Sequence, residues 1–85
     1  PLDKDTVIQS VRKTGRFAVV HEAAKSFGPG AELMALVNEG AFLSLEAPPT
    51  RLAGFDVTIP IPRGEHHYFW DAPRIAVGLR KVARY

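Results

Sequence analysis

The sequence predicts an α/β fold in which a mostly parallel sheet is covered by helices, and three observations support this class. Segments with helical spacing alternate with two short runs suited to strands, at residues 17–20 and 50–55. The first run, Phe17-Ala18-Val19-Val20, is apolar without alternation, which is typical of a strand covered on both faces. Strands joined through a helix pair in parallel with a right-handed crossover, and the order here is helix, strand, helix, strand, helix.

Composition bounds the size and class of the protein. A chain of 85 residues forms one domain at most, and it buries only about 60–65% of its unfolded surface. The absence of cysteine excludes disulfides and thiolate metal sites, and it fits a reducing compartment. No apolar run approaches the roughly 18 residues that a membrane span needs, and no signal peptide is visible. We therefore expect no membrane partner.

The first helix is expected to begin at Asp3 or Asp5, either of which can cap it, and to stop at Gly15. One face of this helix carries its apolar residues, which are Val7, Ile8 and Val11. Cations gather near its last turn, where the helix dipole favours them, namely Arg12, Lys13 and Arg16.

The middle of the chain should hold a strand, a helix and a second strand. The strand at 17–20 is expected to end at His21-Glu22, with a loop over residues 23–29. A second helix over 30–45 is apolar on most sides, so it should pack against more than one neighbour. The two prolines at 48 and 49 break it, and the second strand follows at 50–55.

The last third of the sequence predicts one helix after an irregular segment. Residues 56–63 contain two prolines and are expected to be extended and irregular, whereas the aromatic segment 66–70 fits no class clearly. Asp71 is expected to cap a third helix, with Pro73 in the first turn, where a missing N–H has no cost. The apolar stripe of this helix consists of Ile75, Leu79 and Val82.

Two strands are too few for a stable sheet, since about three or more are usually needed. The buried character of residues 17–20 therefore requires neighbouring strands that this sequence does not contain. The chain also begins at Pro1 without a methionine. We expect residues 1–85 to be a single partial domain, with its earlier strands upstream of Pro1.

Two candidate sites lie near the end of the first strand. Phe27-Gly28-Pro29-Gly30 precedes a helix N-terminus, where α/β folds bind anions. It lacks dinucleotide-binding and P-loop spacing, so a tight turn that needs glycine is the alternative. His21-Glu22 stands where such sheets place site residues, and a histidine there can act as an acid–base group. No serine or cysteine nucleophile is placed to meet it, and a structural or interface hydrogen bond is the alternative.

Three further features each have a functional and a structural interpretation. In an extended Glu65-His66-His67 segment the two imidazoles point to opposite faces, which disfavours a metal site. Tyr68, Phe69 and Trp70 are either an interface anchor or cover for the core. The third helix carries cations that either form a solvated face or dock to an acidic partner or nucleic acid, namely Arg74, Arg80, Lys81 and Arg84. A net charge of +2 and the lack of a recognisable motif disfavour nucleic acid as a partner.

An ordered series of short blocks resembles a known family. The blocks are Pro1-Leu2-Asp3, Val19-Val20-His21-Glu22-Ala23, Gly30-Ala31-Glu32, Glu46-Ala47-Pro48, Arg51, Gly54-Phe55-Asp56, Ile59-Pro60, Tyr68 and Asp71-Ala72. Their order and spacing resemble the C-terminal part of the β subunit of thiamine-diphosphate 2-oxo-acid dehydrogenases of the pyruvate, branched-chain and acetoin types. That region belongs to the transketolase C-terminal domain family.

The resemblance implies a three-layer α/β/α domain whose upstream strands are missing from this chain. It also implies a parent oxidoreductase that decarboxylates a 2-oxo acid on thiamine diphosphate and passes the acyl group to a lipoyl-bearing acyltransferase. In this family, thiamine diphosphate and magnesium are bound by the α subunit and the N-terminal domain of the β subunit. The resemblance therefore implies no catalytic, cofactor-binding or metal residue in this chain.

The expected function is that of a non-catalytic assembly domain within a multienzyme complex. Its partners would be the α subunit and a second β subunit of a heterotetramer, together with the lipoyl acyltransferase, in the bacterial or archaeal cytoplasm or the mitochondrial matrix. One alternative is an independent small α/β module that binds an anion or nucleic acid, and another is a free-standing hydrolase using His21. The interface candidates are His21, Glu22, Phe27, Tyr68, Trp70, Arg80, Arg84 and Tyr85.

Overall fold

The computed structural model describes residues 1–56 and 70–85. Strands β1 (Ala18–Ala24) and β2 (Thr50–Gly54) pair in parallel, as the sequence predicts. The expectations for residues 57–69, which include Tyr68 and the Glu65-His66-His67 group, lie outside the described residues. The elements are α1 (Lys4–Thr14), β1 (Ala18–Ala24), α2 (Pro29–Ala41), the 3-10 helix η1 (Phe42–Ser44), β2 (Thr50–Gly54) and α4 (Ala72–Ala83).

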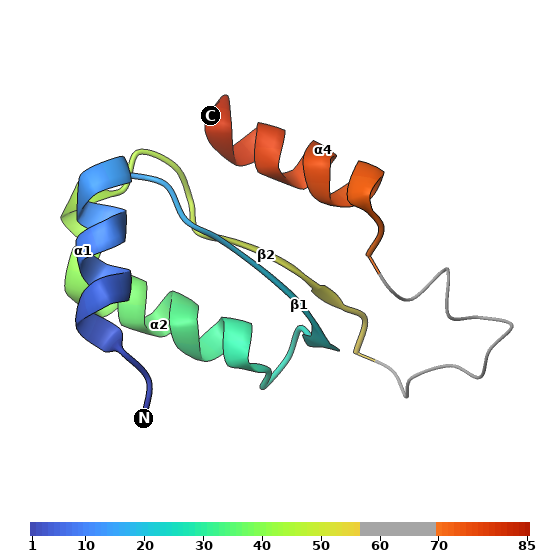
Figure 1. Ribbon diagram of the computed structural model, residues 1–85, viewed down its shortest axis with the longest axis horizontal. Helices are drawn as coiled ribbons and strands as arrows, with labels where there is room; N and C mark the ends of the chain where they lie inside the picture. The colour runs from blue at the N-terminus through green and yellow to red at the C-terminus, as the bar shows by residue number, and fades with distance from the viewer. Residues whose placement is uncertain (57–69) are drawn as a thin grey trace, which may run out of the picture.

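The two strands lie between helices, with α2 on one face and α4 on the other (Figure 1). The register pairs Val20 with Leu52, so their side chains share a face. On that face Leu52 packs against Gly78 of α4, while Val19 on the opposite face packs against Gly30 of α2. The predicted α/β class is therefore confirmed, with helices on both sides of a parallel sheet.

Both predicted helix caps are confirmed. The Asp3 carboxylate accepts a hydrogen bond from the Thr6 N–H at 3.2 Å, and the Asp71 carboxylate accepts one from the Arg74 N–H at 3.0 Å. Gly15 ends α1 in the left-handed conformation at φ 73°, where a residue with a Cβ would be strained. The Thr6 hydroxyl and then the Thr6 N–H lower the pKa of Asp3, so the cap stays charged at neutral pH.

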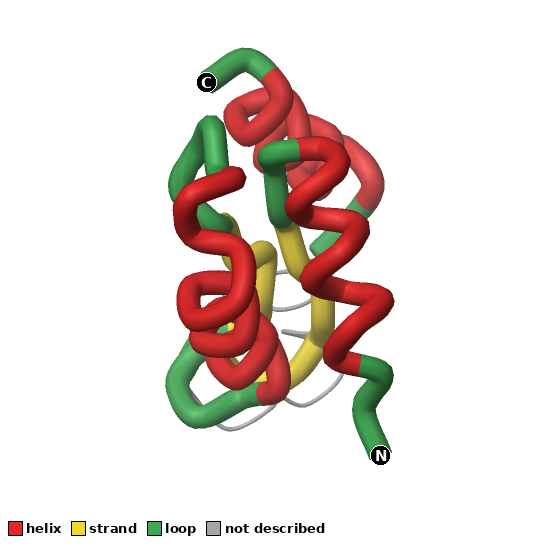
Figure 2. Tube along the Cα trace, turned by 90° about the vertical axis from the view of Figure 1, so that its left-hand side faces the viewer, coloured by secondary structure: helices red, strands yellow, loops and turns green. Residues whose placement is uncertain are grey.

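The core lies between α1, α2 and the sheet. Val37 of α2 is fully buried and clusters with Val11 of α1 and with Ala41. Figure 2 shows α1 and α2 side by side in front of the strands. Because α2 contacts α1 as well as both strands, the prediction that it packs against more than one neighbour is confirmed. The residues that pack around this cluster are Val7, Ile8, Phe17 and Leu45.

Three boundaries differ from the prediction. Strand β1 continues to Ala24 instead of ending at His21-Glu22, because its pairing with β2 resumes at Ala24 and Gly54 after an irregularity. The helix expected over 30–45 instead ends at Ala41, since the backbone of that residue leaves the helical region at φ −143° before η1 begins. Strand β2 ends at Gly54, one residue before the predicted end.

The prediction that residues 17–20 are covered on both faces is wrong for the described chain. Val19 packs against α2, but Val20 on the α4 face is 42% exposed. Helix α4 packs over β2 at Leu52, and it leaves the neighbouring position on β1 open. The predicted additional strands and the extent of the complete domain stay predictions.

Candidate functional site

The carboxyl ends of β1 and β2 are joined by hydrogen bonds between the segments that follow them. The Lys25 N–H donates to the Gly54 carbonyl at 3.0 Å. The Ser26 N–H donates to Asp56 Oδ1 at 2.8 Å, and the Ser26 hydroxyl donates to Asp56 Oδ2. These bonds hold two loops together as one surface at the carboxyl edge of the sheet, the edge at which parallel α/β folds usually place their sites.

The Asp56 carboxylate is the acceptor at the centre of this surface. The Ser26 hydroxyl, followed by the Ser26 N–H, lowers the pKa of Asp56, and the nearby charge of Arg51 adds to the effect. Asp56 is therefore ionised at neutral pH, where it accepts both bonds. Arg51 also donates from Nη1 to the Lys25 carbonyl at 2.6 Å, which adds a further link between the two segments.

His21 lies on β1 and turns its imidazole toward the start of α2. The Gly30 N–H donates to Nε2 at 3.0 Å, so a neutral His21 carries its proton on Nδ1. Nδ1 is buried and has no hydrogen-bond partner among the described residues. Gly30 is required here because a Cβ at this position would overlap Nε2. This geometry matches the alternative in which His21 makes a structural hydrogen bond. The imidazole occupies the Gly30 N–H at the start of α2, which a bound anion would otherwise use.

Phe27 and Glu22 lie on the outside of the same edge. The Phe27 side chain is fully exposed, and its backbone adopts φ 57°, in the left-handed region. An aromatic residue is rarely found there, and strained positions of this kind concentrate at functional sites. Glu22 is also exposed, on the strand itself. The structure thus groups Phe27 and Glu22 with His21 at one edge.

The other interface candidates belong to the α4 side. Trp70 is half-buried, and its Nε1–H donates to the Ala53 carbonyl of β2 at 2.7 Å, so it covers the edge of that strand. Arg80, Arg84 and Tyr85 are exposed at the end of α4. Figure 1 shows this end near the amino ends of the strands, away from the carboxyl edge. The candidates therefore form two separate groups.

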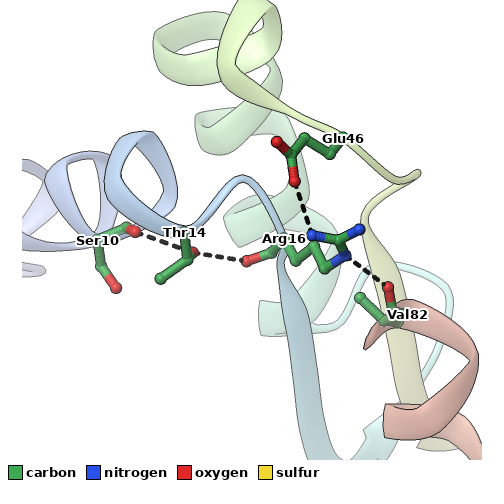
Figure 3. Close-up of polar contacts among 5 residues, drawn as sticks. All are labelled: Ser10, Thr14, Arg16, Glu46 and Val82. Carbon is green, nitrogen blue, oxygen red and sulfur yellow. Dashed lines mark hydrogen bonds and ion pairs between the residues drawn. The ribbon is translucent and has the colours of Figure 1, made fainter. Parts of the chain in front are cut away.

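Sequence reasoning missed the role of Arg16. Its Nε–H donates to the Val82 carbonyl at 3.0 Å, and Nη1 forms an ion pair with Glu46 at 2.7 Å (Figure 3). The Glu46 N–H donates in turn to the Gly15 carbonyl at 2.7 Å. The sequence placed Arg16 only among the cations near the first helix. No local pattern could reveal partners 30 and 66 residues away.

Within residues 1–56 and 70–85, no three histidine, cysteine or carboxylate side chains group closely enough to hold a metal ion. In the same ranges, no helix is long and apolar enough to cross a membrane.

Comparison with known sequences decides the family. The family described as "Transketolase, C-terminal domain" matches residues 1–75. The chain belongs to this family. Its helices around a parallel sheet agree with the α/β fold of this family. The resemblance predicted from the ordered sequence blocks is therefore confirmed.

Curated relatives of this transketolase C-terminal domain are β subunits of dehydrogenases. The chain is 54% identical over 84 residues to the pyruvate dehydrogenase E1 component subunit beta of Acholeplasma laidlawii, covering 99% of this chain and 26% of that protein. It is 44% identical to the 2-oxoisovalerate dehydrogenase subunit beta of Pseudomonas aeruginosa, covering 96% of this chain and 23% of that protein. A Bacillus subtilis pyruvate dehydrogenase E1 subunit beta is 42% identical over 85 residues, or 100% of this chain and 26% of that protein. The chain thus spans about a quarter of the length of these relatives.

Proposed function

We propose that this chain is the non-catalytic assembly domain of a 2-oxo-acid dehydrogenase β subunit. The observation that carries the proposal is Phe27, a fully exposed aromatic side chain on a left-handed backbone. Exposed aromatic anchors dominate the binding energy of protein interfaces. The family membership and the names of the relatives, all of them β subunits, support a subunit contact as the role of this anchor.

The surface around Phe27 is pre-organised for binding. The preceding residue, Ser26, is bonded through its N–H and hydroxyl to Asp56, and Lys25 is bonded to Gly54. Phe55, 59% exposed, lies between Gly54 and Asp56 on the adjoining segment. A loop that is already ordered loses less conformational entropy when it binds, so more of the contact energy appears as affinity.

The parent enzyme is proposed to decarboxylate a 2-oxo acid oxidatively with thiamine diphosphate and magnesium. The described residues do not fit a magnesium site, since no group of three ligating side chains is present in them. As the family resemblance implies, we propose that the cofactor is held by other segments of the parent and by its α subunit. When bound, thiamine diphosphate supplies the carbanion chemistry that decarboxylation needs. The relatives named above are bacterial, which favours the cytoplasm over the mitochondrial matrix.

The end of α4 is proposed as the second contact surface, where the lipoyl acyltransferase docks. Arg80 and Arg84 are exposed there, and Tyr85 is 75% exposed. Basic side chains beside an exposed aromatic residue fit a partner surface that combines acidic and apolar groups. This surface is separate from the edge that holds Phe27, so both contacts can form at once.

The alternative of an independent anion-binding module receives less support. Its site was the N-terminus of α2, but the Gly30 N–H already donates to His21. The Ala31 N–H is likewise engaged, because it donates to the Gly28 carbonyl at 3.0 Å. A phosphate at this point would have to displace a contact made within the chain.

The test is co-expression of the complete β chain with its α subunit. We expect a heterotetramer that decarboxylates a 2-oxo acid only when thiamine diphosphate is present. The control is a shortened β chain that ends before Pro1, and we expect that it fails to assemble with the α subunit. A tetramer of the shortened form with full activity would refute the proposal.

A further inference from the structure

A cavity of about 400 Å³ lies between β2 and α4. Its volume falls within the range of small-molecule sites, which is about 300–1,000 Å³. It lies on the α4 face of the sheet and reaches Lys25, two residues before Phe27, at the carboxyl edge. Its lining is mostly apolar and includes Ala47, Pro48, Leu52, Trp70, Val77, Gly78, Val82 and the ring of Tyr85.

Among the residues that the structure describes, those with charge around this cavity are all cations. They are Lys25, Arg51, Arg74 and Lys81, and the described lining includes no aspartate or glutamate. Within residues 1–56 and 70–85, the ammonium groups of Lys25 and Lys81 have no ion pair. Arg74 lies 3.6 Å from Asp71, and Arg51 uses one N–H on the Lys25 carbonyl. Positive charge at the mouth of an apolar cavity attracts anions and holds them there.

The walls of the cavity are held in place by bonds outside it. Trp70 is fixed by its 2.7 Å hydrogen bond to Ala53, and Val82 by the bond that its carbonyl accepts from Arg16. Gly78 allows α4 to approach Leu52 so closely that an added Cβ would lie 2.5 Å from the leucine side chain. A cavity with fixed walls is pre-formed, and a ligand that enters it need not reorganise the protein.

We propose that this cavity binds a small organic anion, an apolar body carrying one or more negative groups. The apolar lining disfavours a bare inorganic anion, and the four cations disfavour a neutral or cationic ligand. The volume favours a small molecule over an extended acidic peptide. This inference does not depend on the assembly role, because it is argued from the lining of the cavity alone, although Lys25 and Tyr85 at its rim also belong to the proposed contact surfaces.

The test uses the complete β chain assembled with its partner subunit and a pair of matched fluorescent probes. 8-Anilino-1-naphthalenesulfonate carries the anionic group, and N-phenyl-1-naphthylamine has the same aromatic body without it. We expect saturable binding of the sulfonate with one site per β chain, about tenfold tighter than binding of the amine. Equal affinity for the two probes would overturn the proposal.

Variants locate the probe. The double variant Lys25→Gln/Lys81→Gln should weaken sulfonate binding about tenfold, whereas Lys4→Gln/Lys13→Gln on α1 should leave it unchanged. Val77→Trp, which fills the cavity from its exposed rim, should abolish binding of both probes. Lys25 and Lys81 are both exposed, so the double lysine variant should fold normally. It therefore still tests the proposal if Val77→Trp fails to fold.

Unchanged binding by the Lys25→Gln/Lys81→Gln variant would show that the sulfonate binds elsewhere. A competition experiment then separates the two classes of occupant. A hexaglutamate peptide that displaces the probe more effectively than 2-naphthoate would make an acidic polypeptide the ligand and overturn the proposal for a small molecule.

Discussion

At the residue scale, a few polar side chains connect segments that the sequence keeps far apart. Arg16 joins the segment before β2 to the last turn of α4, through Glu46 and the Val82 carbonyl. A charged donor at a helix C-terminus also compensates the partial negative charge of the last carbonyls. The ion pair is solvent-accessible, with 34% and 63% of the two side chains exposed, so the bond to Val82 is the stronger contribution.

Arg16→Met should therefore loosen α4 more than Glu46→Gln does. Losing the bond from a charged donor costs about 1–2 kcal/mol, which would speed amide exchange in the last turn of α4 by roughly five- to thirtyfold. Glu46→Gln, which removes only an exposed charge, should change exchange by less than about fivefold. Hydrogen exchange of residues 79–83 in the complete protein measures both, and equal effects would contradict the assignment.

The Ser26–Asp56 contact predicts a pH dependence. Its bonds lower the pKa of Asp56 in the folded chain, so the stabilisation is present above the unfolded pKa and is lost as pH falls through the lowered folded value. The link therefore persists at neutral pH and weakens only in acid, below about pH 4. Ser26→Ala should raise the pKa of Asp56, as followed by the carboxyl carbon signal in an NMR titration. An unchanged pKa in this variant would show that Ser26 is not its cause.

At the element scale, the start of α2 is held by His21 of β1, whose imidazole accepts a hydrogen bond from the Gly30 N–H. His21→Leu would leave the buried Gly30 N–H without its acceptor, which costs about 1–3 kcal/mol. His21→Gln retains an acceptor and should lose less. Thermal unfolding and the exchange rate of residues 29–33 check this order of stability. Equal stability of the two variants would mean that the bond to Gly30 contributes nothing.

Local elements were predictable from sequence because local chemistry determines them. Asp3, Gly15 and Asp71 delimit helices through contacts three or four residues away, and all three were predicted. The end of β1 at Ala24 was not predicted, because it depends on pairing with Gly54 thirty positions along the chain. The candidate site likewise has a part that was predicted from sequence and a part that was not. Phe27 was singled out from its sequence position, whereas the partners of Arg16 and Asp56 required the fold.

At the scale of the whole molecule, several large apolar side chains of the described residues are exposed, as the prediction of a partial domain requires. Val20 is 42% exposed on a strand whose composition suits burial, and Phe27, Leu43 and Phe42 are each more than half exposed. They lie at separate places, Phe27 before α2 and the adjoining Phe42 and Leu43 after it, and large exposed apolar patches mark interaction surfaces. The proposed assembly role would cover these side chains with other parts of a dehydrogenase.

The most direct test of the assembly role is the mass of the complex when Phe27 is changed in the complete β chain. Asn tolerates φ 57° but lacks the aromatic ring, whereas Tyr keeps the ring. Light scattering after gel filtration, at concentrations from nanomolar to micromolar, should show Phe27→Asn dissociating at least about tenfold more readily than wild type, with Phe27→Tyr unchanged. A Phe27→Asn complex as stable as wild type would contradict the claim that this exposed aromatic residue anchors the assembly.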